Sequence, residues 1–113
     1  MKRTFIILLF IVGVYACTKN KGNETAVDCS GPAKSFAADV THIFQASCTN
    51  GSGCHGSGST NGPGALLTYA QVFGARINIR SAVASGHMPL NGTLTASDKN
   101  AILCWIDTGS PNN

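Results

Sequence analysis

Apolar residues recur at the spacing of an α-helix in four stretches of the chain, and no stretch alternates apolar and polar residues as a strand would. The helical pattern covers residues 35–48, 68–73, 75–84 and 95–107. Ser35, Thr68 and Thr95 stand where three of these helices begin, and short hydroxyl side chains often cap helix N-termini. The pattern therefore predicts an all-α fold, with three to four short helices joined by long loops.

A glycine-rich segment, residues 49–64, follows the first predicted helix. Glycine adopts backbone conformations that are closed to other residues and lets the chain pass close to a bulky group. By itself such a segment is also compatible with a flexible linker. The apolar run 65–67 that follows it indicates that the chain returns to the core.

The N-terminal residues 1–16 have the pattern of a secretory signal. Two basic residues precede an apolar stretch, residues 5–14, which is too short for the roughly twenty residues of a membrane-spanning helix. The stretch leads to Ala16 followed by Cys17, and this ending resembles a lipobox, where bacterial lipoproteins are cut before a cysteine that is then acylated. An uncleaved anchor and an ordinary signal with a chance cysteine are the alternatives.

Cleavage before Cys17 would divide the mature chain into a lipidated flexible tether, residues 17–28, and a folded domain, residues 29–113. A domain of this size buries a modest core and often depends on disulfides or a cofactor. We expect the lipid to hold it on a bacterial membrane, with the domain in the periplasm or at the cell surface.

The charge of the chain gives no sign of a nucleic-acid partner. Eight Lys and Arg residues stand against five Asp and Glu, a formal charge of +3, and two of the basic residues belong to the signal. No basic run and no mixture of basic and aromatic residues is present. Binding to nucleic acid is therefore not expected.

Besides Cys17, the chain contains Cys29, Cys48, Cys54 and Cys104. Outside the cytoplasm disulfides persist, and four cysteines allow three complete pairings. Another solution uses one pair for a cofactor and the other for a single bridge between Cys29 and Cys104, which would join the two ends of the domain. Spacing alone does not decide between these solutions.

Cys54 is followed directly by His55, and this pair carries the chemical argument. Covalent haem attachment needs thiols that add to the vinyl groups and an imidazole placed at the iron, and the usual pattern is C-x-x-C-H. Here five residues separate Cys48 from Cys54, so the pattern departs from the usual one. Gly51 and Gly53 would let the extra residues bulge outward; otherwise Cys48 is free, or paired with Cys29 or Cys104.

The candidate for a second iron ligand is Met88, which is followed by Pro89 in a loop. A thioether sulfur binds haem iron and raises the reduction potential, and proline stiffens the loop. Met1 is the only other methionine and belongs to the signal. A core-filling role for Met88, and ligation by the neighbouring His87, are the alternatives.

Taken together, these features resemble small c-type cytochrome lipoproteins of Bacteroidota and the planctomycete-type cytochrome c domain. The matching segments are residues 43–48 (IFQASC), 53–56 (GCHG), 67–69 (LTY), 88–89 (MP) and 105–112 (WIDTGSPN). The resemblance implies a class I cytochrome c fold around one covalently attached haem c, with His55 as proximal and Met88 as distal ligand. It also implies electron transfer with redox partner proteins and no enzymatic activity. We expect a monomer that meets the membrane only through its lipid.

Three other functions are compatible with the residues. The main alternative is a haem-free binding or structural lipoprotein held by two disulfides, which leaves the Cys54–His55 and Met88–Pro89 pairs as coincidences. A zinc site on Cys48, Cys54 and His55, with or without His87, is less favoured, because zinc sites use more closely spaced ligand pairs. A haem enzyme or sensor would require Met88 to leave the iron.

Overall fold

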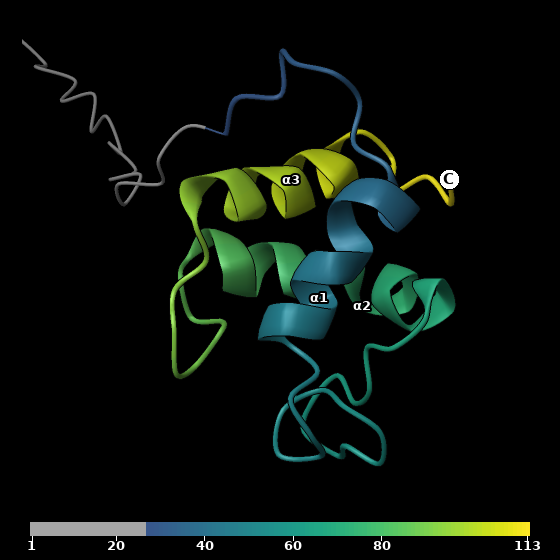
Figure 1. The fold of residues 1–113 in the computed structure, drawn as a ribbon, viewed down its shortest axis with the longest axis vertical. Helices are drawn as coiled ribbons and strands as arrows, with labels where there is room; N and C mark the ends of the chain where they lie inside the picture. Colours follow the sequence, from purple (N-terminus) through teal and green to yellow (C-terminus); the bar gives the residue numbers. More distant parts are fainter. Residues whose placement is uncertain (1–26) are drawn as a thin grey trace, which may run out of the picture.

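The computed structural model describes residues 27–113, and in this part of the chain three α-helices and one π-helical turn form without any strand (Figure 1). The elements are η1 (Phe36–Val40), α1 (Thr41–Ser47), α2 (Tyr69–Ala84) and α3 (Ala96–Asp107). The predicted all-α class is confirmed. The signal, Cys17 and the tether up to residue 26 lie outside the described residues. Within 27–113 no helix has the length and apolarity needed to cross a membrane.

The first predicted helix begins with a π-helical turn rather than with α-helix. Ser35 caps it as expected, since its Oγ accepts the Ala38 N–H at 3.0 Å. Both the backbone N–H and the hydroxyl of Thr41 donate to the Phe36 carbonyl, which closes the wider turn. The expected helix 35–48 is therefore two elements, η1 and α1, and the change of pitch between them leaves Val40 completely buried.

The C-terminal residue of the chain is bound to the start of η1. The Asn113 carbonyl accepts the Ala37 N–H at 2.8 Å and the Ser35 hydroxyl at 3.0 Å, and the Asn113 Oδ1 accepts the Phe36 N–H at 3.2 Å. Helix N-termini have N–H groups without partners inside the helix, and Asn113 supplies acceptors for two of them. The C-terminus of the chain therefore lies at the start of η1.

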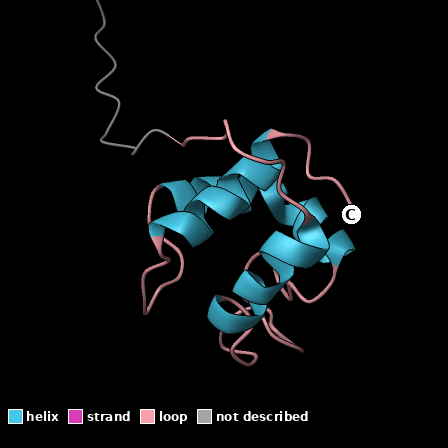
Figure 2. Ribbon diagram, turned by 45° about the horizontal axis from the view of Figure 1, so that its top comes forward, coloured by secondary structure: helices cyan, strands magenta, loops and turns pink. Residues whose placement is uncertain are grey.

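One continuous helix, α2, stands where the sequence pattern predicted two, and Figure 2 shows that the described residues form only helices and loops. The prediction of a break near Gly74 is wrong. Glycine weakens a helix by only about 1 kcal/mol relative to alanine. Val72 and Ala75 are buried on either side of Gly74, so packing holds the helix through it. The expected cap is present, since Thr68 Oγ1 accepts the Gln71 N–H and the Gln71 side chain accepts the Thr68 N–H in a complete capping box.

Helix α3 is the central element of the core and packs against both α2 and η1. Its residues 101–106 are all buried, and Trp105 is completely so. The Trp105 Nε1–H donates to the Pro111 carbonyl at 2.9 Å, which satisfies its one polar atom. Phe36 and Tyr69 pack on this indole from η1 and α2, with ring centroids 5.4 and 6.3 Å from that of Trp105.

A disulfide joins Cys29 to Cys104, as the one-bridge solution expected. Cys104 lies in the buried part of α3, and Cys29 lies in the segment before η1 that runs beside this helix (Figure 1). The Asn100 side chain also donates to the Asp28 carbonyl at 2.6 Å. The N-terminal segment is therefore fastened to α3 by one covalent bond and at least one hydrogen bond.

Candidate cofactor site

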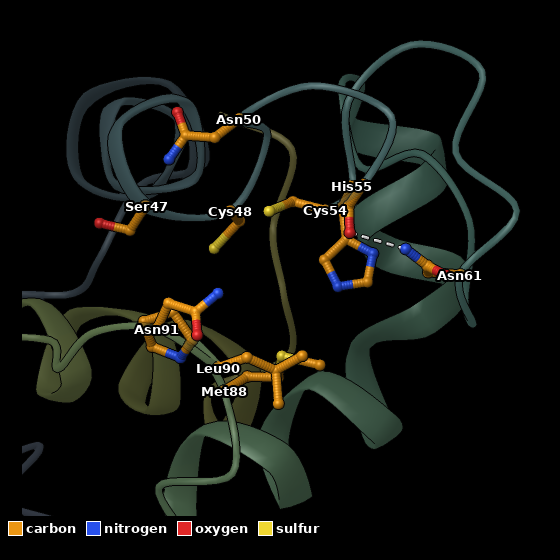
Figure 3. Close-up of a pocket in the computed structure, with 11 residues that line it drawn as sticks. Ser47, Cys48, Asn50, Cys54, His55, Asn61, Met88, Leu90 and Asn91 are labelled. Atoms are coloured by element: carbon orange, nitrogen blue, oxygen red, sulfur yellow. Dashed lines mark hydrogen bonds between the residues drawn. The ribbon is translucent and has the colours of Figure 1, made fainter.

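A cavity of about 270 Å³ lies between the end of α1, the glycine-rich loop and the loop after α2 (Figure 3). Its lining includes all four residues that the sequence predicted as haem-binding. The lining residues are Ser47, Cys48, Asn50, Gly53, Cys54, His55, Asn61, Met88, Pro89, Leu90 and Asn91. Two segments far apart in sequence, residues 47–61 and 88–91, thus meet at one space, and that space holds two thiols, an imidazole and a thioether.

His55 is the buried polar group of this cavity, with 8 % of its surface exposed. Its Nδ1 lies 2.9 Å from the Gly64 carbonyl oxygen. A carbonyl oxygen only accepts, so Nδ1 carries a proton, and in the uncharged imidazole the lone pair lies on Nε2. The Leu66 N–H donates to the His55 carbonyl at 2.9 Å. The ring is thereby oriented by the second half of the glycine-rich loop.

Residues 48–56, called the thiol loop below, fold back on themselves. The His55 N–H donates to the Cys48 carbonyl at 2.9 Å, which closes the five-residue gap between the two cysteines. The Gly51 carbonyl accepts the N–H groups of Cys54 and Gly56 at 3.2 and 2.9 Å. Both cysteine side chains consequently remain at the cavity.

Cys48 and Cys54 are both free thiols and both partly buried. Burial is the main cause that raises the pKa of the Cys48 thiol from 9.0 to about 11, and the neighbouring charge of an ionised Cys54 adds to it. The Cys48 thiol is therefore protonated at neutral pH. Figure 3 shows the two sulfur atoms on the same side of the space into which the His55 ring projects.

Met88 lies at the wall opposite His55 in the view of Figure 3. The Met88 N–H donates to the Ala82 carbonyl at 3.1 Å, which holds the start of its loop against the end of α2. His87 is exposed and is not among the lining residues. Leu90, two residues after Met88, is 67 % exposed at the edge of the cavity.

No lysine or arginine lines the cavity, and those in the described domain are engaged elsewhere. Arg80 binds both carboxylate oxygens of Asp107 at 2.6 and 2.9 Å, which connects α2 to α3. Arg76 lies over the Phe73 ring and donates to the Phe73 carbonyl. Lys99 donates to the Ala84 carbonyl, and Lys34 pairs with Asp39. The described cavity wall is therefore made of neutral groups.

Sequence reasoning missed the Gly64 carbonyl and the three asparagines of the wall. The Gly64 oxygen is a backbone atom, so no residue type in the sequence indicates its role. Asn61 donates its amide to the Gly53 carbonyl at 2.7 Å and joins the two halves of the glycine-rich loop. Asparagine is common in any turn, so its presence there carried no specific signal.

A metal site of the zinc type has no support in the described domain. Among residues 27–113 no group of three or more His, Cys, Asp and Glu side chains is placed to hold a metal ion. The donors at the cavity are of another kind: one nitrogen with a free lone pair, one thioether and two thiols. The nitrogen and the thioether can bind iron, and the thiols can add covalently to a carbon–carbon double bond.

The chain has no match among known proteins in any of three comparisons. No protein-family model matches it, no curated protein sequence matches it, and no solved structure matches it.

Proposed function

We propose that this chain is a c-type cytochrome with a single haem that carries electrons outside the cytoplasm. The observation that supports this best is His55, whose Nδ1–H is taken by the Gly64 carbonyl at 2.9 Å. The remaining nitrogen, Nε2, is then the one available to iron, in a cavity that Met88 and two free thiols also line. Metal-binding histidines commonly have their other nitrogen bonded to a backbone carbonyl in this way.

His55 Nε2 and the Met88 sulfur would hold the haem iron, and Cys54, next to His55, would attach the haem through a thioether. Haem c, when bound, supplies a one-electron iron couple. The backbone hydrogen bonds of His55 and Met88 hold these two residues in place, to Gly64, Leu66 and Ala82. Because His55 and Met88 would both hold the haem iron, no position on it would be left for a substrate. The proposed role is therefore electron carriage and not enzymatic catalysis.

The haem-free lipoprotein with two disulfides is less well supported. That alternative requires a second bridge besides Cys29–Cys104, whereas Cys48 and Cys54 are free thiols that line the same cavity. It also gives no role to the orientation of His55. The proposed protein would be anchored through a lipid on Cys17 and would act as a monomer that exchanges electrons with redox partner proteins.

The test is the absorption spectrum of the protein produced with a cytochrome c maturation system, oxidised and after reduction with dithionite. We expect a covalently bound haem with a sharp reduced α-band and, in the oxidised form, a weak long-wavelength band from sulfur ligation. Met88→Ala should lose the weak band and keep the haem. His87→Ala, which changes the exposed neighbour outside the cavity, should keep both. A colourless wild-type protein would exclude the cytochrome and leave the disulfide-held lipoprotein.

A further inference from the structure

We propose that Asn91 is a site of spontaneous deamidation, which converts its side-chain amide into a carboxylate on the wall of the cavity. The chain contains nine asparagines, and only Asn50, Asn61 and Asn91 are followed by glycine. These same three residues line the cavity, and all three are exposed. Asparagine and glycine both favour turns, so the fold accounts for the pairs, but the pairs also have a chemistry of their own.

Deamidation of asparagine starts from the backbone of the next residue. Its N–H nitrogen attacks the side-chain amide carbon, a C–N bond forms, and the amide nitrogen leaves as ammonia with the displaced hydrogen. Water then opens the five-membered succinimide ring to aspartate or isoaspartate, and no oxidant or reductant takes part. Glycine leaves the attacking nitrogen unhindered, since it has no Cβ atom, and gives the backbone the freedom to close the ring.

The fold restrains Asn50 at both reacting groups. The Gly51 N–H, which would have to attack, donates to the Thr49 carbonyl at 2.8 Å. The Asn50 Nδ2 donates to the Ala46 carbonyl at 3.4 Å. The turn would therefore have to open locally before the succinimide could form.

Asn61 is restrained through its side chain and its backbone. Its Nδ2 donates to the Gly53 carbonyl at 2.7 Å, and its backbone N–H donates to the Ser59 hydroxyl at 3.3 Å. The Asn61 carbonyl also accepts the Gly64 N–H. Three hydrogen bonds thus fix the amide carbon relative to the backbone that would attack it.

Asn91 has no restraint of this kind. In the part of the chain that the structure describes, neither the Asn91 side chain nor the Gly92 N–H makes a hydrogen bond. Both residues are exposed, and a Cβ atom at Gly92 would meet no atom within 4 Å. The backbone around Gly92 is therefore free to bring its nitrogen to the amide carbon, and Asn91 should convert first.

The conversion changes the charge of the cavity wall, which consists of neutral residues. No lysine or arginine lines the cavity, so a carboxylate at position 91 has no opposite charge on the wall. The consequence for the iron rests on the proposed function. Negative charge near haem iron favours the ferric over the ferrous state, so the reduction potential should fall as the protein ages.

The experiment follows the three asparagines by peptide mass while the full protein stands in mildly alkaline buffer. Conversion replaces an amide NH2 by OH, and chromatography separates the aspartate and isoaspartate peptides. In folded protein Asn91 should convert several-fold faster than Asn50 and Asn61. In guanidinium chloride the three should convert at similar rates, because the restraints are lost. Equal rates in folded protein, or an unconverted Asn91, would overturn the proposal.

The matched variants are Gly92→Ala and Gly62→Ala. A Cβ atom at either position meets no atom within 4 Å, and neither glycine has a positive φ, so both variants should fold. Gly92→Ala should slow the conversion of Asn91 several-fold, because the methyl group hinders the attacking nitrogen. Gly62→Ala should leave that rate unchanged. Conversion of Asn91 at the wild-type rate in Gly92→Ala would contradict the succinimide route.

The effect on the iron is tested separately with Asn91→Asp, which reproduces the converted side chain. Asn78→Asp adds the same charge at an exposed position of α2 outside the cavity. The reduction potential of the haem-loaded Asn91→Asp protein should lie below that of Asn78→Asp, and equal potentials would overturn the effect on the iron. Protein without haem would overturn the proposed function, while the mass measurement, which does not involve haem, still decides the deamidation.

Discussion

At the scale of single residues, the site depends on neutral groups held in fixed orientations. In His55 the Gly64 carbonyl oxygen assigns a proton to Nδ1, and burial keeps the Cys48 thiol uncharged. Neither residue has a charged partner on the cavity wall. The environment therefore favours the uncharged form of Cys48, and that preference links protonation to folding.

The haem-free protein should lose stability as the pH rises from 9 towards 11. In the folded state the Cys48 pKa is raised to about 11, above its ordinary value of 9.0. The folded state therefore binds the thiol proton more tightly than the unfolded state does. This contribution is complete below pH 9 and disappears as the pH approaches the folded pKa. Urea unfolding at a series of pH values measures it. Cys48→Ala should show a shallower decline, and equal slopes in the two proteins would contradict the pKa shift.

Residue type alone was enough to predict the reactive residues of the cavity, but not the groups that position them. Cys54, His55 and Met88 were identifiable because few residues bind iron or add to a vinyl group, and the structure brings all three to one cavity. Gly51 takes the left-handed conformation that an outward bulge needs. The demand for glycine at position 56 was not predictable, because it arises from the Thr49 and Gly51 carbonyls, whose positions depend on the folded loop.

At the scale of elements, local signals set where helices begin, and packing decides whether they continue. The three predicted caps, Ser35, Thr68 and Thr95, each accept a backbone N–H in the first turn. The sequence did not predict the π-helical turn or the continuation of α2 through Gly74, since both depend on contacts with other elements. Burial of Val72 and Ala75 outweighs the local preference of one glycine.

Removal of the α2 cap should lower the stability of the whole domain. Thr68→Ala deletes the hydroxyl that accepts the Gln71 N–H, and losses of this kind cost about 1 kcal/mol in the free energy of unfolding. Urea denaturation of the haem-free protein measures the change. Ser81→Ala is the control, because Ser81 is exposed in the interior of the same helix. A loss as large in the control would mean that the cap has no special role.

At the scale of the whole molecule, the domain is closed at its ends. Asn113 binds the start of η1, and the Cys29–Cys104 bridge links the first described segment to the core helix α3 over a separation of 75 residues. Small domains bury limited apolar surface, so such closures carry a large share of their stability. The sequence suggested the bridge as one of several pairings, and only the fold brings Cys29 beside Cys104.

Loss of the bridge should destabilise the domain more than loss of a cap. In the chain-entropy model a loop of this length contributes about 4 kcal/mol, and measured values are typically about 2–4 kcal/mol. Cys29→Ser is the suitable variant because Cys29 is exposed, whereas Cys104 is buried. Its urea midpoint should fall well below that of wild type and should not change further with a reductant. An unchanged midpoint would show that the bridge is absent from the mature protein.

The bridge also determines how a mechanical load enters the domain. A pull applied at the N-terminal end of the described chain reaches Cys29 before any helix, and the covalent bond passes it directly to Cys104 within α3. The force then acts on α3, the most deeply buried helix. It bypasses η1 and α1, because these elements follow Cys29 in the sequence. The thiol loop and the Met88 loop lie between Cys29 and Cys104 in the sequence, so a pull between the two ends of the described chain leaves the distance between His55 and Met88 unloaded.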